Sequence, residues 1–478
     1  MGKNKNMNRR DFLKAGGIST AAIALSSTGL FSFTQSSALA SSKTARSSFS
    51  GYGPLVKDPG GVLDLPQGFQ YRIISEEGGF MADGRPIPEK FDGMAAFPGQ
   101  NNSTVLVRNH ELSGNTKYPV IGRNPYQREH TGGTTALVLD ANRKVQKEYV
   151  TSSGTIRNCA GGATLWGTWL TCEETLEEGH GYVFEVDPSD PENNLSRTPI
   201  RDMGAFSHEA TAIDPATGIV YLTEDAGPSY FYRFIPHDRS QRIGALQKGG
   251  VLQAAAMEQM SSDHSSDFYT GQRFGIVWKD VDPEKPTMEA SQKGCIPFSR
   301  LEGAYFEGGV FWFDDTSAGD NNLGRVYRYI PATNTLELFY ESTELNDLEM
   351  PDNICITPWG DLWIAEDGGG TDRIIGMTPE GETYVFAENR LNGSELAGPT
   401  FSTRGDTFFV NIQTPGITFA IWGPFARKNA GRQRQMGHAA PPEQYAPKVS
   451  DKLSAAAEVE GMSNLEAAAF QRHGMPIL

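Results

Sequence analysis

Short runs of acidic residues recur along the sequence, each directly after an apolar segment. Carboxylates gathered in a poorly hydrated funnel repel one another, so they must be protonated or neutralised by cations. A solvated surface explains any single run, but recurrence at one position of a repeat favours cation binding. The runs are Asn109-His110-Glu111, Glu173-Glu174, Glu224-Asp225, Asp314-Asp315 and Glu366-Asp367, with Asp352-Asn353 before the fifth segment.

The ligand types narrow the choice of metal. Carboxylate and Asn oxygens are hard ligands and favour calcium, magnesium, manganese or ferric iron. Cys159, within the motif NCAGG (158–162), would add a thiolate, which suits iron better than calcium alone. A buried, inert cysteine is the alternative for that residue. The sequence contains no HExxH motif and no paired-His zinc spacing, which argues against a zinc protease.

Two further motifs, SHEA (207–210) and RLEG (300–303), place a glutamate beside another functional residue. Arg300 lies two residues before Glu302, so on an extended segment both side chains point to one face. A guanidinium beside a metal-bound carboxylate can grip an anionic oxygen with two hydrogen bonds. The alternative for Arg300 is a salt bridge inside the site. His208 precedes Glu209, although a solvated or buried histidine is the more frequent case.

A repeat must position these residues. Each copy has a small turn, an apolar strand and a polar or acidic pair, and the spacing of most copies is typical of a propeller. The sequence therefore predicts an all-β, six-bladed β-propeller with inserted loops, residues 240–298 being an insertion, and a C-terminal helix. A two-sheet sandwich is the alternative. The copies are 97–111, 163–174, 214–227, 306–319, 357–368 and 401–413.

The two ends of the chain differ from the repeat. Residues 1–40 have a basic start, the pair Arg9-Arg10, an apolar stretch and the small-x-small site Ala38-Leu39-Ala40. This order predicts a twin-arginine signal peptide, with an uncleaved anchor as the alternative. We expect the propeller over 41–425 and a polar linker with a helical tail over 426–478. The helix-forming stretch is 450–474.

Charge and cysteine content limit the partners. The chain carries a formal net charge of −16, which argues against nucleic acid or an anionic membrane as a partner. No stretch after the leader is long and apolar enough for a membrane helix. Cys159, Cys172, Cys295 and Cys355 are even in number, so disulfides are possible after export, but no CxxC occurs.

In order along residues 50–425, the motifs resemble those of the PhoX family of alkaline phosphatases. The motifs are NHE, GGTT, NCAGG, WGTWLTCEE, SHEA, YLTED, PDNI, TPWGDLWIAEDG and FVNIQTPGITFAIWGPF. The resemblance implies a periplasmic or secreted, monomeric propeller that hydrolyses phosphate monoesters. It also implies a mixed iron and calcium cluster (Fe3+ and Ca2+) at the channel mouth. The implied partners are small phosphate esters and, during export, the twin-arginine translocase.

Residue by residue, the same resemblance implies roles in the site. Cys159, Glu209 and Glu302 match iron ligands, and Arg300 matches a phosphate clamp. Cys159, Arg300 and Glu302 would then be the catalytic set. Calcium ligands or their neighbours would be Glu111, Glu173, Asp352 and Glu366.

Two other functions are compatible with an acidic propeller. A calcium-dependent esterase or lactonase would use one calcium ion on the axis and would need neither Cys159 nor Arg300. A non-catalytic propeller would bind a partner on its face, and its metals would only brace the fold.

Overall fold

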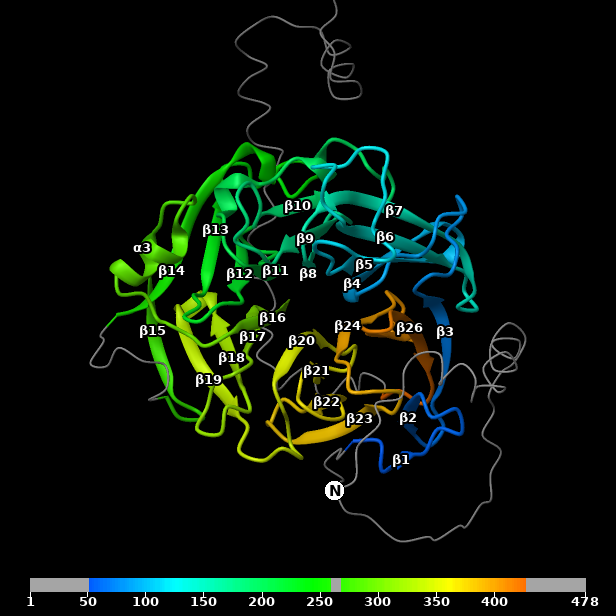
Figure 1. The fold of residues 1–478 in the computed structure, drawn as a ribbon. Coiled ribbons are helices and arrows are strands. Elements are labelled where there is room, and N and C mark those ends of the chain that lie inside the picture. Colours follow the sequence, from blue (N-terminus) through cyan, green and yellow to red (C-terminus); the bar gives the residue numbers. More distant parts are fainter. Residues whose placement is uncertain (1–50, 259–267, 427–478) are drawn as a thin grey trace, which may run out of the picture. The chain divides into compact units, whose positions relative to one another are not determined.

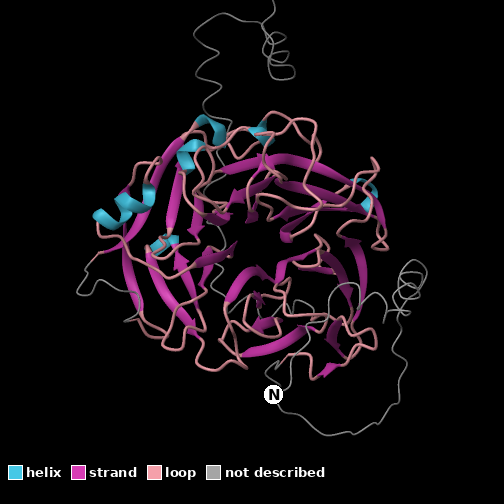
Figure 2. Cartoon of the chain, in the orientation of Figure 1, coloured by secondary structure: helices cyan, strands magenta, loops and turns pink. Residues whose placement is uncertain are grey.

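The computed structural model describes residues 51–258 and 268–426. The predicted signal peptide and helical tail lie outside these ranges. The described residues are strands and turns, which confirms the all-β prediction; their one α-helix is α3 (Pro286–Gln292) (Figure 2). Single turns of 3-10 helix also occur at η1 (Gln100–Asn102), η2 (Leu195–Arg197), η3 (Arg201–Met203), η4 (Leu246–Lys248) and η6 (Pro331–Thr333). Within the described ranges, no helix is both long and apolar enough to cross a membrane.

Antiparallel sheets stand around a common centre (Figure 1). The first contains β4 (Phe91–Pro98), β5 (Thr104–His110), β6 (Gly132–Leu139) and β7 (Val145–Thr155); the second contains β8 (Asn158–Ala163), β9 (Trp169–Glu173) and β10 (Val183–Val186). A nine-stranded sheet runs through β11 (His208–Ile213), β12 (Val220–Glu224), β13 (Tyr232–Pro236), β14 (Gly250–Met257), β15 (Arg273–Asp280), β19 (Thr335–Glu341), β18 (Arg325–Ile330), β17 (Val310–Asp315) and β16 (Leu301–Glu307).

Segments from the N-terminal side complete the remaining two sheets. One runs through β1 (Leu55–Val56), β2 (Leu63–Pro66), β23 (Thr383–Asn389), β22 (Arg373–Met377), β21 (Leu362–Glu366) and β20 (Pro351–Ile356). The other contains β24 (Leu396–Phe401), β25 (Phe408–Ile412), β26 (Ile417–Trp422) and β3 (Gln70–Glu76).

The innermost strands form a closed cycle. Each packs on the next, in the order β4, β8, β11, β16, β20 and β24, and β24 returns to β4 (Figure 1). Antiparallel sheets arranged in this way around an axis form a propeller. Large apolar side chains fill the space between neighbouring sheets, for example Phe231, Phe311 and Phe313 in one cluster and Trp363 and Phe386 in another.

Residues 240–298 differ from the prediction of an inserted loop. They contain β14, which pairs with β13, and β15, which pairs with both β14 and β19. The sequence hid β14 because its run of alanines, Ala254 to Ala256, has low strand propensity. Pairing with β13 over five residue pairs stabilises it in spite of that propensity.

A buried ion pair lies where the two ends of the propeller domain meet. Arg108 on β5 donates a 2.6 Å hydrogen bond to Glu148 on β7 and a 2.7 Å bond to the Thr418 hydroxyl on β26. Glu148 also accepts from Ser75 on β3. Arg108 is fully buried, and its guanidinium lies 3.4 Å from the centre of the Phe91 ring. The pair thus joins the first sheet to the sheet that contains both β3 and β26.

We predict that Arg108→Ala lowers the free energy of unfolding by about 3–5 kcal/mol, because it leaves the Glu148 carboxylate buried and unpaired. Urea titration followed by tryptophan fluorescence measures this loss. Arg85→Ala is the control, since it removes the exposed Arg85–Asp83 pair and should cost less than about 1 kcal/mol. Equal losses in the two variants would contradict a role for Arg108 in closure.

Candidate metal centre

Every inner strand begins with a β-bulge. Near the start of each inner strand, the register of its pairing with the second strand shifts. A bulge of this kind can redirect a side chain. The shifts occur between Phe91 and Met94, Asn158 and Gly161, His208 and Thr211, Leu301 and Ala304, Pro351 and Ile354, and Ala397 and Thr400. Five of these bulges contain a residue able to bind a metal: Asp92, Cys159, Glu209, Glu302 and Asp352.

A repeated backbone hydrogen bond brings a second layer of residues to the same level. The carbonyl oxygen of the residue before or at the start of each inner strand accepts the N–H of the residue that follows the second strand. The pairs, acceptor first, are Lys90 and Glu111, Arg157 and Glu174, Ser207 and Asp225, Arg300 and Thr316, Met350 and Asp367, and Glu395 and Gln413, at 2.8–3.2 Å. Carboxylates from separate sheets therefore converge near the ends of the inner strands.

Polar side chains of the second strands fix the bulge in the inner strand of the next repeat around the ring. The Asn109 amide on β5 donates to the carbonyl oxygens of Cys159 (3.0 Å) and Ala160 (2.6 Å) on β8. The Thr223 hydroxyl donates to the Glu302 carbonyl oxygen at 2.6 Å, and the Asn411 amide on β25 donates to that of Asp92 at 2.7 Å. Each bond is buried, so it holds the backbone of a ligand-bearing residue in place.

Two glycines permit the close approach of adjacent inner strands. A Cβ atom on Gly303 would lie 2.2 Å from the Asp352 carbonyl oxygen, and one on Gly162 would lie 2.0 Å from that of Thr211. Any larger residue would push the strands apart. Gly162, in the NCAGG motif, lies on β8 with Cys159. Its lack of a side chain lets β8 approach the neighbouring strand β11 closely.

Three groups of side chains could each hold a cation. Within each group the candidate ligand atoms all lie within 4.8 Å of one another. The groups are Cys159, Glu174 and Glu209; Glu209, Glu302 and Asp352; and Asp92, Glu111 and Glu395. The first two share Glu209. The structure therefore brings together the sequence-predicted Cys159, Glu209, Glu302 and Asp352, and places Glu111 in the third group.

The electrostatics of these groups favour bound cations. Burial, together with the Glu302 carboxylate, raises the pKa of Glu209 well above its ordinary value. Burial, with Asp352 as the main neighbouring charge, does the same for Glu302. Burial also raises the pKa of the Cys159 thiol, and Glu209 raises it further. Positive ions would stabilise the ionised forms of all three.

Arg300 lies at the edge of the second group. Its Nε and Nη2 donate to the two carboxylate oxygens of Asp225 at 2.9 and 3.1 Å, and Nη2 also donates to Glu302 at 2.5 Å. About a third of the side chain (32%) remains exposed, so an anion arriving from solvent can reach it. The Asp315 carboxylate fixes the Arg300 backbone by accepting its N–H at 3.0 Å.

In two of the acidic pairs, the two residues have different roles. The first carboxylate anchors the loop that enters an inner strand: Glu173 accepts from the Ile156 N–H and Glu366 from the Glu349 N–H. Glu173 also contacts His180, and Glu366 pairs with Arg373. Both glutamates lie outside the three groups, so their assignment as metal ligands stays a prediction that the geometry does not favour.

Three members of the groups were absent from the predicted ligand set. Glu174 is the second residue of its pair, and it was passed over in favour of Glu173. Asp92 and Glu395 belong to no acidic pair. The signal that identifies Asp92 is its place two residues beyond Lys90, which matches Arg300 and Glu302 in the later repeat.

The histidines and the other cysteines serve the core. The His208 Nε2–H donates to the Gly204 carbonyl oxygen (3.0 Å), and the ring stacks on Phe206. His110 contacts the Thr135 hydroxyl at 2.8 Å. All four cysteines lie in the described residues, where each is buried and free, so the disulfide alternative is not realised.

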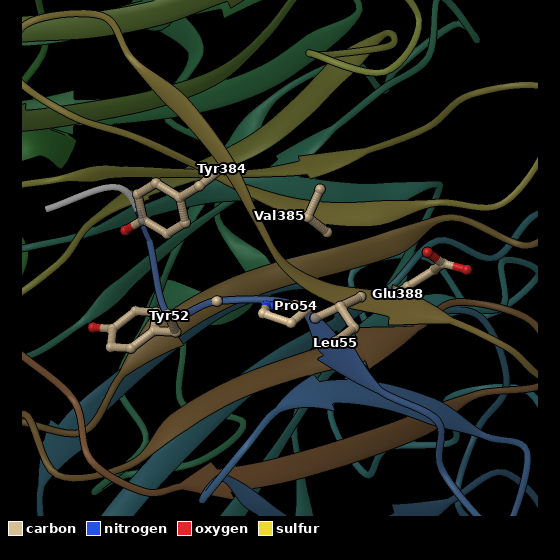
Figure 3. Close-up of a pocket in the computed structure, with 7 residues that line it drawn as sticks. Tyr52, Pro54, Leu55, Tyr384, Val385 and Glu388 are labelled. Carbon is tan, nitrogen blue, oxygen red and sulfur yellow. The ribbon is translucent and has the colours of Figure 1, made fainter. Parts of the chain in front are cut away.

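A surface pocket lies elsewhere, between the segment 52–55 and β23 (Figure 3). Tyr52, Pro54, Leu55, Tyr384, Val385 and Glu388 line it, and Glu388 points away from the two tyrosines. Its single carboxylate forms an ion pair with Arg390. The pocket thus lacks the clustered ligands of the three groups.

Comparisons with known proteins agree with this geometry. A family model described as alkaline phosphatase PhoX matches residues 50–147 and 139–416. A model of the twin-arginine translocation pathway signal sequence matches residues 6–26. The chain therefore carries a twin-arginine signal and is exported to the periplasm or beyond it.

One solved structure shares the fold. Pseudomonas fluorescens PhoX in complex with vanadate, a transition state analogue, is 17% identical and superposes with a TM-score of 0.60, over 76% of this chain and 96% of that one. A gluconolactonase of Xanthomonas campestris is 10% identical, with a TM-score of 0.40, over 78% and 99%. A curated relative, a probable leucine aminopeptidase of Arthroderma otae, is 30% identical over 102 residues, which is 21% of this chain and about a quarter (26%) of that protein.

The carboxylate cluster predicts an inverse dependence of stability on pH in metal-free protein. Burial, with repulsion from Glu111, raises the pKa of Glu174 to about 7, against the pull of Arg157. The folded state therefore holds a proton that the unfolded state has released, and stability falls as pH rises from about 4.5 to 7.

In excess chelator we expect Glu174→Gln to reduce this fall by about 1–3 kcal/mol, because the amide cannot ionise. Denaturation midpoints at pH 5, 6, 7 and 8 measure the effect. The exposed Glu344→Gln is the control and should leave the pH dependence unchanged. A wild-type midpoint that rises from pH 5 to 7 would contradict the prediction.

Proposed function

The chain belongs to the alkaline phosphatase PhoX family, and from that premise we propose that it hydrolyses phosphate monoesters outside the cytoplasm at the centre described above. The observation that carries this proposal is the convergence of Cys159, Glu209 and Glu302 beside Arg300. These residues come from the separate inner strands β8, β11 and β16. Their meeting requires three inner strands that lie far apart in the sequence and pack on one another, which makes an accidental surface cluster a poor explanation.

The donor atoms support two kinds of cation. The first group combines the Cys159 sulfur with two carboxylates, a set that suits iron. The third group, Asp92, Glu111 and Glu395, offers only hard carboxylate oxygens, which suit calcium. We assign the Glu209, Glu302 and Asp352 group to a cation that shares Glu209 with the iron site. The raised pKa values of Asp92 and Glu395, caused mainly by burial, support cation binding in the third group.

Phosphoryl transfer needs positive charge around the non-bridging oxygens and an attacking oxygen in line with the leaving group. Bound cations supply such charge and make a bound water more acidic. Arg300 supplies the protein's own contribution: its guanidinium can pair with two phosphate oxygens. Asp225 holds that guanidinium by two hydrogen bonds before substrate arrives, so little side-chain freedom is lost on binding.

The architecture we propose for this activity is a six-bladed propeller over 41–425, with the nine-stranded sheet counted as two blades joined through β15. The bulges support this count, because the same register shift occurs once in each of six strand pairs. We propose a monomer, since the ring closes within one chain, with the signal peptide over 1–40 and the polar, helical tail over 426–478.

The alternatives explain less. An esterase or lactonase with one axial calcium, or a propeller braced by metals, would leave the Cys159 thiol and the partly exposed Arg300 without a role. The discriminating experiment is metal analysis of the purified protein beside turnover of a chromogenic phosphate monoester. Iron and calcium with phosphatase turnover support the proposal; calcium alone with carboxylic ester turnover would replace it.

We predict that Cys159→Ala removes iron and lowers phosphatase kcat/KM by more than about 100-fold, since the ligand and the charge it holds are both lost. Elemental analysis and kinetics on 4-nitrophenyl phosphate measure the two effects. The control, Cys355→Ala, removes a buried thiol that belongs to an apolar cluster and to none of the three ligand groups, and it should keep its iron. Undiminished iron in Cys159→Ala would remove this cysteine from the centre.

We also predict that calcium chelation stops turnover reversibly, because Asp92, Glu111 and Glu395 would be left as repelling carboxylates. Incubation with excess EGTA should abolish activity, and added calcium should restore it. EGTA saturated with calcium beforehand is the control. Full activity in excess EGTA would refute a role for calcium.

A further inference from the structure

Arg157 occupies the same position in its repeat as Arg300. Each arginine lies two residues before a candidate ligand, in Arg157-Asn158-Cys159 and Arg300-Leu301-Glu302. Each carbonyl oxygen accepts the N–H of the residue after the second strand, at 3.0 Å from Glu174 and 2.8 Å from Thr316. The repeat therefore brings both guanidinium groups to the same end of the propeller.

Their contacts are also alike. Arg157 Nη2 lies 2.8 Å from Glu111 Oε1 and donates to Glu174 Oε2, so it joins two of the three carboxylate groups. Arg300 joins Asp225 to Glu302 in the same manner. The Arg157 side chain is 41% exposed, more than that of Arg300 at 32%, so a ligand from solvent can reach both.

The two arginines contact carboxylates of one connected cluster. Arg157 contacts Glu174, and the ligand atoms of Glu174 and Glu209 lie within 4.8 Å of each other. Those of Glu209 and Glu302 lie within the same limit, and Glu302 contacts Arg300. This row of neighbouring carboxylates thus carries one guanidinium at Glu174 and another at Glu302.

The backbone at Arg157 is unfavourable for an arginine. Its φ of +46° lies in the left-handed region, which glycine and asparagine adopt more easily. The arginine is thus held there at a conformational cost by the surrounding contacts. Lys90 (φ +57°) and Met350 (φ +47°) adopt the same conformation directly before β4 and β20, so this backbone belongs to the repeat and must be kept in any test of the Arg157 side chain.

We propose that Arg157 is a second anion-binding residue of the centre, placed at Glu174 as Arg300 is placed at Glu302, and that it selects phosphate monoesters over diesters. This inference rests on the proposed phosphatase function. A monoester carries close to two negative charges at neutral pH and three non-bridging oxygens. A diester has one charge and two such oxygens, so the second guanidinium has less to bind.

Arg157→Asn tests this inference, because asparagine tolerates the left-handed backbone while removing the charge. Against 4-nitrophenyl phosphate we expect KM, and the dissociation constant of inorganic phosphate, to rise by about 10- to 100-fold through loss of a charged hydrogen bond. The kcat/KM for bis(4-nitrophenyl) phosphate should change by less than about threefold. Arg157→Lys should regain part of the phosphate affinity, since it keeps the charge without the planar fork.

The control is Arg242→Asn, which removes one exposed charge paired with Asp238. Iron and calcium content is measured in every variant, and phosphate binding to the metal-loaded proteins is measured by calorimetry. Equal losses for the two esters, unchanged phosphate affinity, or loss of metal in Arg157→Asn would each overturn the inference. A wild type that binds phosphate but turns over neither ester would overturn the proposed function instead, and calorimetry would still decide the role of Arg157.

Discussion

Side chains of a regular strand alternate between the two faces of its sheet, and in a propeller both faces pack on neighbouring sheets. A bulge near the start of each inner strand interrupts this alternation, and five of the eight candidate ligands belong to the bulged residues: Asp92, Cys159, Glu209, Glu302 and Asp352. The bulges therefore position most of the site. Asn109, Thr223 and Asn411 hold the backbone there from the second strand of another repeat, which links the packing of the ring to the positions of Cys159, Glu302 and Asp92.

The arrangement also explains why so many carboxylates coexist. Anchoring residues such as Glu173 and Glu366 obtain backbone N–H groups, His180 or Arg373 as partners, and they order the loops behind the inner strands. The residues that follow them, Glu174 and Asp367, face other carboxylates instead. Two arginines partly offset this repulsion, and cations would complete the neutralisation. Within each of these acidic pairs, the first residue thus stabilises the fold and the second faces the proposed metal centre.

The propeller and the convergence of acids were predictable from sequence, because turns, apolar strands and acidic pairs repeat together. The choice within a pair was not, since Glu173 and Glu174 have the same chemistry and only the local twist of the strand end separates them. Asp92 was missed because the prediction sought pairs, whereas the bulge presents a single residue. Glu395 was missed because it is a single acidic residue directly before β24. β14 was missed because its alanines have low strand propensity. Its structure is decided by pairing with β13, which local sequence patterns do not reveal.

The last sheet of the ring joins β3, from the start of the domain, to β26, from its end. The Gly416 N–H bonds the Glu77 carboxylate across 339 residues of sequence. Contacts of such long range form late and slowly, because the intervening chain must be ordered first. This seam therefore cannot form before β26, which ends at Trp422, has been synthesised. The signal peptide remains attached until then. Transport must therefore wait until the ring of sheets has closed, so correct export depends on a check of folding as well as on folding rate.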